Sequence, residues 1–378
     1  MHIAIRTDDN HHHLDDENII VSISQEVARR VPEWYGSNIS LESEIPQKCK
    51  YPNSFFLRYQ LIGFKKNPRA LLVKIPREKH VSSLAKAIVN HELGEMAERE
   101  FALLVDVSYF VNKLKKLSYA AIRPLCYLDR WNAIVMEELP SRTLENLAFD
   151  LRTRFRINPE WNLFKDSLCI TGRWMRIYHE VLGDWQFAPL DVDALILEIE
   201  QKINILMMAQ PRFTDWEEIQ TKFRQILENL RGLLVPHVNL HGDLFFTNVL
   251  ITADQRVAVI DLARDMRGPI YTDLSSMIIE LVEQRLKVSS IGFVINQPTI
   301  RSLENAILEG YSDTGVDDLP VLSIFCAKLL LSVWNWYEQR VENSSRVNKL
   351  FLRSIHPFIR YYLCREIRSY LKRAENMI

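Results

Sequence analysis

One stretch of the chain limits its possible folds more than any other: two short apolar segments that follow a polar loop. The loop carries His241, Asp243 and Asn248 in the spacing H-x-D-x-x-x-x-N, and Asp261 ends the second segment, thirteen residues after Asn248. The segments NVLIT and RVAVID are separated only by ADQ, which predicts a tight hairpin. Because a hairpin folds the chain back on itself, Asn248 and Asp261 should lie at neighbouring strand ends.

These residue types suit phosphoryl transfer. A carboxylate such as Asp243 can orient the hydroxyl of an acceptor, while an amide oxygen and a second carboxylate, here Asn248 and Asp261, can hold Mg²⁺ against nucleotide phosphates. The structural alternative makes them a helix cap, a turn residue and a strand-end carboxylate, and it needs three coincidences. The pattern favours the functional interpretation.

The surrounding segments predict a chain of two lobes. Strands are expected at 54–62 and 70–75, one long helix from about 82 to 115, and a second strand pair that ends in NAIVMEEL. After Pro140 the pattern is helical to the end, apart from the hairpin. The predicted fold class is α+β, with a small β-rich N-lobe over 38–138 and a larger, mostly helical C-lobe over 139–378. A polar leader and a first helix are expected over 1–37.

The segment LHGDLFFTNVLI resembles the HGDLHPGNVLV brace of the aminoglycoside phosphotransferase and choline-kinase-like family. VIDLARDMRGPIYTDLSSM is similar to the family's IDF…GDPxxDLA segment, and two helical segments, GRWMRIYHEVLG and AILEGYSD, are similar more weakly. The resemblance covers most of the chain from about residue 40 to 315. It implies a protein-kinase-like fold and an ATP- or GTP-dependent kinase.

The resemblance also assigns roles to residues of this chain. It makes Asp243 the catalytic base and makes Asn248 and Asp261 ligands of Mg²⁺. His241 stands with Asp243 in the catalytic loop, where its ring would brace the loop. Asp273 would be a second support of the same loop.

The N-lobe should then supply nucleotide-binding groups. Lys74 ends the apolar strand ALLVK, where its ammonium can reach the α- and β-phosphates. AEREFALL resembles the start of the family's lobe helix and makes Glu100 the partner of Lys74, whereas Glu98 lies about 200° round the helix and would point elsewhere. The segment MEEL matches the family's hinge, so the backbone of Glu138 and Leu139 is expected to bind adenine.

Two departures from the family pattern affect these expectations. The nucleotide loop corresponds to IPQKCKYPNSFF, which has no glycine, and Ser54 is its candidate phosphate contact, together with Lys48 and Lys50. The residues after HGD are Leu-Phe-Phe-Thr, which predicts an apolar surface near the base.

Composition excludes several other classes of function. Lys plus Arg (47) balances Asp plus Glu (48), so charge gives no argument for nucleic-acid binding. The five cysteines are scattered and form no CxxC, which argues against a disulfide framework or a zinc ribbon and predicts a cytoplasmic protein. No membrane-spanning helix is expected.

The C-terminal segment carries an excess of positive charge, because residues 337–378 hold nine Lys or Arg against four Glu. A packed final helix is favoured there, with surface association through its basic face as the weaker alternative.

The resulting functional hypothesis is a small-molecule kinase. It would transfer the γ-phosphoryl group of ATP or GTP to a hydroxyl of an amino sugar, sugar, amino alcohol or antibiotic. The first alternative is a pseudokinase-like scaffold that binds nucleotide without turnover, which the glycine-free loop favours and the intact Asp243, Asn248 and Asp261 set opposes. A protein kinase ranks lower, because no Ala-Pro-Glu segment follows Asp261.

Overall fold

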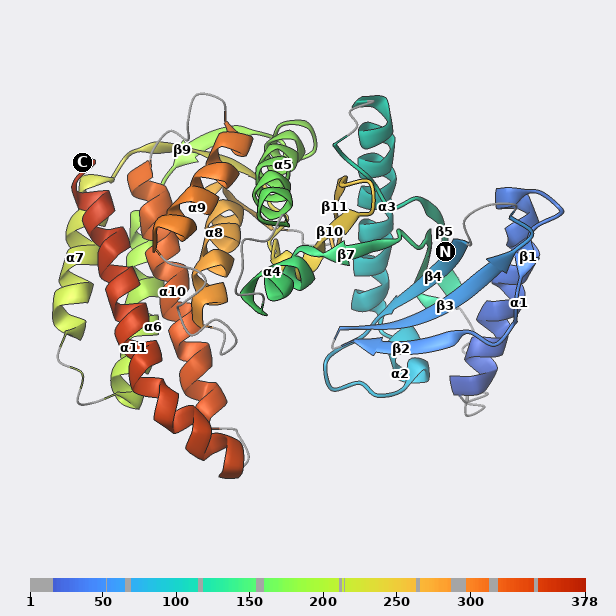
Figure 1. Cartoon of the computed structure of the whole chain (residues 1–378), viewed down its shortest axis with the longest axis horizontal. Coiled ribbons are helices and arrows are strands. Elements are labelled where there is room, and N and C mark those ends of the chain that lie inside the picture. The colour runs from blue at the N-terminus through green and yellow to red at the C-terminus, as the bar shows by residue number, and fades with distance from the viewer. Residues whose placement is uncertain are drawn as a thin grey trace, which may run out of the picture. The chain divides into compact units, whose positions relative to one another are not determined.

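The structure is a computed structural model, and it describes residues 16–51, 53–64, 69–114, 118–153, 160–210, 213, 215–262, 266–286, 297–312, 319–342 and 346–378. The expected polar leader before residue 16 lies outside the described residues. The chain divides into two compact units (Figure 1). The N-terminal unit comprises Met1–Lys116 and Ala120–Pro140, and the C-terminal unit comprises Leu117–Tyr119 and Ser141–Ile378. The division therefore falls two residues after the expected limit of the N-lobe.

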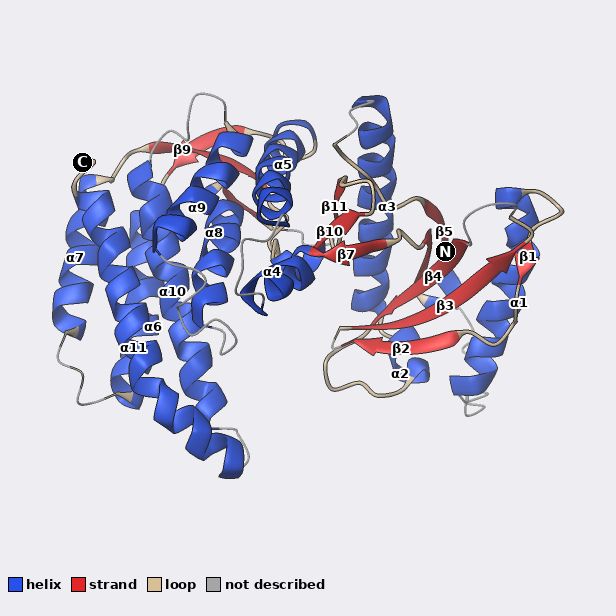
Figure 2. Ribbon diagram, in the orientation of Figure 1, coloured by secondary structure: helices blue, strands red, loops and turns tan. Residues whose placement is uncertain are grey.

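An antiparallel sheet organises the N-terminal unit (Figure 2), with the strand order β1-β3-β4-β6-β5 and with β2 paired to β3. The expected strands at 54–62 and 70–75 are confirmed as β3 and β4. The elements of this unit are α1 (Asp16–Tyr35), β1 (Ser40–Leu41), β2 (Gln47–Tyr51), β3 (Ser54–Ile62), β4 (Arg69–Pro76), α2 (Leu84–Ile88), α3 (His91–Leu114), β5 (Pro124–Leu128), a 3₁₀ turn (Asp129–Trp131) and β6 (Ala133–Glu137).

Helix α1, which lies in the region of the expected first helix, contributes to this unit's core. Its buried residues, Ile23 and Val27 among them, form one cluster with Leu57 of β3 and Val73 of β4. Each such fully buried branched side chain stabilises the fold by roughly 1.5–3 kcal/mol. Because side chains alternate along a strand, burial of Val73 under α1 puts the next residue, Lys74, on the opposite face of the sheet.

The prediction of a single helix from about 82 to 115 is wrong in one respect, because the structure has two helices there, α2 and α3. The Oδ1 atom of Asn90 accepts a hydrogen bond from the N–H of Leu93 at 3.2 Å, as an N-cap does. The amide of Asn132 donates to the carbonyls of Ile88 and Asn90 at 2.9 and 3.2 Å, which caps the end of α2. The interruption thus depends on a side chain more than forty residues away, which helical periodicity does not reveal.

The C-terminal unit is mostly helical, as expected, and the predicted hairpin is present as β10 and β11. The prediction of no other strand after Pro140 is wrong, because β7 pairs with β10, and β9 pairs with both β8 and β12. These strands have three to six residues, too few for a clear alternating pattern. The elements are β7 (Ser141–Thr143), α4 (Leu144–Thr153), α5 (Glu160–Val181), β8 (Gln186–Pro189), α6 (Val192–Ala209), α7 (Trp216–Asn229), β9 (Leu234–Asn239), a 3₁₀ turn (Phe246–Asn248), β10 (Val249–Thr252), β11 (Val257–Val259), β12 (Arg267–Pro269), α8 (Tyr271–Leu286), α9 (Gln297–Tyr311), α10 (Leu319–Glu342) and α11 (Arg346–Glu375).

The basic C-terminal segment forms α11, which packs along α10 (Figure 1). Arg360 donates to Glu338 of α10, Arg368 lies 2.6 Å from Glu218 of α7, and Arg373 lies 2.8 Å from Glu304 of α9. Several basic side chains of α11 are therefore paired with carboxylates of neighbouring helices. By length and composition, one helix among the described residues, α10, is apolar enough to cross a membrane, but 67% of that stretch is buried inside the protein, as in a core helix.

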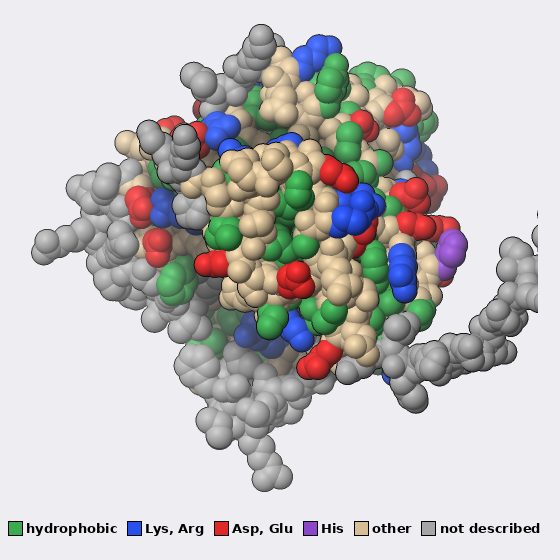
Figure 3. Space-filling model, turned by 90° about the vertical axis from the view of Figure 1, so that its right-hand side faces the viewer, with side chains coloured by type: hydrophobic (Ala, Val, Ile, Leu, Met, Phe, Trp, Pro, Cys, Tyr) green, Lys and Arg blue, Asp and Glu red, His purple; other side chains and the backbone are tan. Residues whose placement is uncertain are grey.

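The near balance of charge is visible on the surface. On the face shown in Figure 3, basic and acidic side chains lie interspersed with apolar ones. This face therefore carries no single-sign field of charge.

Candidate active site

The N-terminal unit contains the predicted lysine–glutamate pair. The Nζ atom of Lys74 on β4 lies 2.6 and 2.9 Å from the two carboxylate oxygens of Glu100 on α3. The exposed fractions of the two side chains are only 10% and 6%. A buried ammonium needs a close counter-charge, and the bidentate geometry supplies one. Glu98 is exposed to solvent, as its position on the helix predicts.

The glycine-free nucleotide loop is a tight hairpin connection between β2 and β3, with Tyr51 opposite Ser54 in the strand register. Ser54 is buried, and its hydroxyl donates to the carbonyl of Asn53 at 2.7 Å. The hydroxyl thus serves the turn itself in this structure. Its predicted contact with phosphate stays a prediction. Lys48, the other described candidate in this loop, is exposed on β2.

The hinge segment ends the sheet after β6. The N–H of Glu138 donates to the carbonyl of Ala70 at 2.8 Å, so this amide is part of the sheet. The Glu138 carboxylate accepts hydrogen bonds from Arg58 at 2.7 to 3.1 Å. Of the backbone groups of Glu138, the carbonyl is therefore the one suited to an adenine amino group. Leu139 follows directly, at the end of the unit.

In the C-terminal unit, the catalytic loop is held by its own histidine. The His241 ring is fully buried, and its Nδ1 atom accepts the N–H of Asp243 at 3.3 Å. The Nε2 atom lies 2.9 Å from the carbonyl of Ile260, which assigns the proton to Nε2. Burial lowers the pKa of His241, although the charge of Asp273 opposes that shift. His241 is thus a neutral positioning residue, and Asp243 is the loop's candidate for contact with a reacting hydroxyl.

Asp273 supports the same loop from the first turn of α8. One of its oxygens accepts the N–H of Gly242 at 2.9 Å, and the other accepts the N–H of His241 at 2.8 Å. Burial alone would raise the pKa of this carboxyl. The hydrogen bond and charge of His179, together with His241 and the N–H of Gly242, outweigh this effect of burial. They hold the pKa of Asp273 below its ordinary range.

His179 and Tyr311 complete this arrangement, and sequence reasoning did not include them in the site. The Nε2 atom of His179 lies 3.0 Å from Asp273, and its Nδ1 atom lies 2.9 Å from the hydroxyl of Tyr311. The ends of α5 and α9 supply these residues, in the Tyr-His and Gly-Tyr segments that carry the weaker family resemblance. Those segments were the only available signal, because partners on distant helices leave no local pattern.

Two glycines let α5 and α9 approach closely enough for this contact. A Cβ atom on Gly172 would lie 2.1 Å from the carbonyl oxygen of Ile307, and one on Gly310 would lie 1.9 Å from that of Cys169. Both distances are impossible for real atoms, so each position requires glycine while the helices stay in place.

The hairpin brings the two predicted metal ligands together. In the strand register Val249 pairs with Val259, and the N–H of Ile260 donates to the carbonyl of Asn248 at 3.0 Å. Asp261, the next residue, has a φ of 61°, a left-handed conformation that few residues other than glycine adopt. Such backbone strain clusters at functional sites.

The donor atoms at this hairpin suit Mg²⁺. The side-chain nitrogen of Asn248 donates to the carbonyl of Asp243 at 2.8 Å, which leaves the amide oxygen as the atom for a cation. Within the described ranges there is no cluster of three or more His, Cys, Asp or Glu that would bind a metal without further ligands. Mg²⁺ is commonly held by one or two protein oxygens plus water and substrate phosphates, so the pair Asn248 and Asp261 fits it.

A cavity of about 420 Å³ adjoins the catalytic loop within the C-terminal unit. Phe245 and Thr247 of the loop line it, as do the carboxylates of Glu145 on α4 and of Glu280 and Glu283 on α8. Apolar side chains of α8 and α10 complete the wall, so the apolar surface expected near the base is present only in part. Among its described lining residues there is no Lys or Arg.

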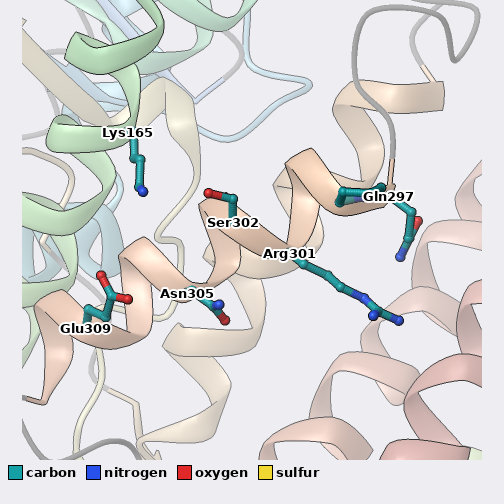
Figure 4. A pocket seen from close by; sticks show the side chains of 7 residues that line it. Lys165, Gln297, Arg301, Ser302, Asn305 and Glu309 are labelled. Atoms are coloured by element: carbon teal, nitrogen blue, oxygen red, sulfur yellow. The ribbon is translucent and has the colours of Figure 1, made fainter.

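A second cavity, of about 570 Å³, lies beside α5 and α9 (Figure 4). Lys165 of α5 and Glu309 of α9 line it, whereas Arg301 extends away from Lys165. No residue of the catalytic loop lines this cavity, whereas Phe245 and Thr247 of that loop line the other one. The cavity beside the catalytic loop is therefore the better candidate for an acceptor.

The fold of each unit and the residues of the catalytic loop are those of a phosphotransferase of protein-kinase-like fold that acts on a hydroxyl group. Residues 171–292 match the sequence model of the Phosphotransferase enzyme family, and this segment includes the catalytic loop, both metal-ligand candidates and Asp273. The match confirms the family resemblance seen in the sequence.

The chain is similar to several solved structures over most of its length. The chain is similar to a glucosamine kinase in complex with glucosamine, ADP and inorganic phosphate, with a TM-score of 0.55, 14% identity and coverage of 96% of this chain and 87% of that one. It also matches a choline/ethanolamine kinase family protein from Mesorhizobium loti (TM-score 0.48, 12% identity, coverage 93% and 99%). An aminoglycoside phosphotransferase from Alicyclobacillus acidocaldarius matches as well (TM-score 0.48, 11% identity, coverage 88% and 93%). No curated protein matches the chain.

Proposed function

We propose that this protein transfers the γ-phosphoryl group of ATP, or of GTP, to a hydroxyl of a small molecule that also carries an amine. Amino sugars, amino alcohols and amine-bearing antibiotics meet this description. The observation that carries the proposal is the cavity beside the catalytic loop, whose charged lining residues are three carboxylates. The glucosamine complex of the similar kinase supports the same class of acceptor.

The carboxylates that line this cavity suit a cation. Burial raises the pKa of Tyr337, which follows Trp336 on α10, to about 12; the negative charges of Glu283 and Glu280 add to this rise, and the positive charge of Arg340 opposes it. The same negative charges would attract an ammonium group, and a rigid wall would orient the molecule that carries it. A sugar without an amine would lack this attraction.

Each candidate residue would then have its own role in phosphoryl transfer. Asp243 would accept a hydrogen bond from the acceptor hydroxyl and direct its oxygen at the phosphorus, while His241 and Asp273 keep the loop in place. Lys74, directed by Glu100, would bind the α- and β-phosphates. Asn248 and Asp261 would hold Mg²⁺, which when bound neutralises phosphate charge. The carbonyl of Glu138 and the backbone of Leu139 would bind the adenine edge. The site would work in the cytoplasm, where the five free cysteines stay reduced.

The test is ADP release with Mg²⁺-ATP and matched acceptor pairs. Each pair compares an amine with a neutral analogue of similar shape: glucosamine with glucose, ethanolamine with ethylene glycol, and choline with 3,3-dimethylbutanol. We expect the amine of at least one pair to have a kcat/KM at least about tenfold higher, because a charge-assisted contact contributes about 1.5–3 kcal/mol. Glu280→Gln should reduce that preference, and Glu309→Gln, in the other cavity, should not. Equal turnover of both members of every pair would contradict an amine-bearing acceptor.

The catalytic role of Asp243 has a separate test. Asp243→Asn keeps the shape of the side chain and removes the carboxylate, so kcat should fall about 10²–10⁴-fold while binding of Mg²⁺-ATP persists. Retention of more than about a tenth of the wild-type rate would refute the assignment. If the wild type binds Mg²⁺-ATP and turns over no acceptor, the scaffold hypothesis is favoured instead.

A further inference from the structure

Arg77 makes an unusual set of contacts in the N-terminal unit. It lies three residues after Lys74 and is 8% exposed. Its Nε and Nη2 atoms donate to the carbonyl of Tyr51 at 2.9 and 2.6 Å, and its Nη1 atom donates to the carbonyl of Val81. Its guanidinium carbon lies 5.0 Å from the centre of the Phe55 ring.

The main chain of Arg77 holds the other side of the same turn. Its N–H donates to the carbonyl of Asn53 at 2.9 Å. The side chain and the backbone of one residue therefore engage the carbonyl oxygens of Tyr51 and Asn53, at the two ends of the β2–β3 connection. A guanidinium loses much of its hydration on burial, and several directed hydrogen bonds are needed to compensate.

The position of this turn relates it to the donor phosphates. Phe56 pairs with Lys74, and Ser54 pairs with Pro76, so the turn lies just beyond the strand residue that is expected to bind phosphate. Carbonyl oxygens repel phosphate, whereas backbone N–H groups attract it. A glycine-rich loop can rotate its peptides to suit the phosphates, and this glycine-free turn has less freedom to do so.

We propose that Arg77 is a positioning residue for the phosphate-binding turn. By binding the two flanking carbonyls it directs them toward β4 and holds the turn in one conformation beside Lys74. This preorganisation replaces the adaptability that glycine would confer. The inference rests on the proposed function, because it assumes that a nucleotide phosphate binds near Lys74.

The hydrogen bond to the carbonyl of Val81 connects Arg77 with a second segment of the unit. Val81 lies in the link between β4 and α2, which leads into the helix that carries Glu100. One guanidinium therefore connects the turn with the segment that leads to the partner of Lys74. Loss of the Arg77 contacts should therefore make the turn more mobile, and should have a smaller, indirect effect on the orientation of Lys74.

The test compares Arg77→Met and Arg77→Lys with the control Arg29→Gln, which removes a surface guanidinium paired with Glu26 on α1. Calorimetry gives the Kd for Mg²⁺-ATP, and steady-state kinetics give separate KM values for ATP and for the acceptor. We expect Arg77→Met to raise the Kd and the KM for ATP about tenfold, Arg77→Lys to raise them less, and the KM for the acceptor to stay within about twofold. Amide hydrogen exchange over residues 53–57 should accelerate in the same order.

A merely structural role would give a different result: fewer active molecules, a lower kcat and an unchanged KM for ATP. If Arg77→Met does not fold, Arg77→Lys, which keeps the charge and most of the stem, decides the question through the same KM comparison. Wild-type binding of Mg²⁺-ATP together with an unchanged Kd in the folded variants would overturn the role of Arg77 alone. Absence of Mg²⁺-ATP binding by the wild type would overturn the proposed function and this inference with it.

Discussion

The substitution Asp273→Asn offers the sharpest check of how the catalytic loop is held. The Asp273 side chain is 1% exposed and accepts three hydrogen bonds of 2.8 to 3.0 Å, from the N–H groups of His241 and Gly242 and from the ring of His179. Asparagine has nearly the same shape but only one acceptor oxygen. In its better orientation it keeps the contacts with His241 and His179, and it then sets its NH₂ group against the N–H of Gly242.

The expected loss of stability follows from this geometry. Loss of a hydrogen bond to a charged acceptor removes about 1.5–3 kcal/mol, and a buried donor that faces another donor costs a further 1–3 kcal/mol or so. A total of about 2.5–6 kcal/mol should lower the Tm of a unit of this size by roughly 5–24 °C. Because the loop backbone must shift, kcat should also fall by roughly tenfold to a hundredfold.

Thermal unfolding of the wild type, Asp273→Asn and a control, Asp193→Asn, measures the effect. Asp193 has an exposed fraction of 79% in its surface pair with Arg231, so its loss should change stability by at most about 0.5 kcal/mol. A fall in Tm of less than about 2 °C in Asp273→Asn would refute the reasoning.

The same reasoning gives a pH dependence. The pKa of Asp273 is lowered by folding, so its stabilising contribution is complete above the unfolded pKa of about 3.9 and is lost as pH falls through the folded value. The stabilities of the wild type and Asp273→Asn should therefore converge in acid. A difference in stability that stays constant from pH 7 down to acid would contradict the role of the charge.

The remaining predictions concern the lysine pair and the helix packing. Lys74→Ala and Glu100→Ala should each reduce turnover, and the double variant should be little worse than the worse single variant, because the second loss removes an interaction already gone. Glu98→Ala is the internal control, and strict additivity of the two single variants would overturn the pairing as a functional unit. Gly310→Ala should lower stability by several kcal/mol, because its Cβ would lie 1.9 Å from a carbonyl oxygen of α5. A melting temperature within about 2 °C of the wild type would show that the helices separate easily.

Features that depend on neighbouring residues could be predicted from the sequence. The hairpin after Asn248 follows from two short apolar runs around a three-residue turn, and it puts Asp261 beside Asn248 whatever the rest of the chain does. The choice of Glu100 over Glu98 follows from helix geometry, which puts the two on different faces. Strands β3 and β4 could be predicted as well, because their length and their β-branched and aromatic residues favour a strand over a helix.

Features that depend on packing were decided only by the tertiary structure. The division between α2 and α3 requires Asn132, and the support of the catalytic loop requires His179 and Tyr311 from the ends of two helices that approach through glycines. The role of Arg77 likewise appears only when β2, β3 and β4 are paired. The sequence by itself indicated the candidate base and metal ligands, since Asp243, Asn248 and Asp261 stand in one local pattern. The folded chain decided what holds those groups in place, because the supporting hydrogen bonds join residues that are dozens of positions apart in sequence.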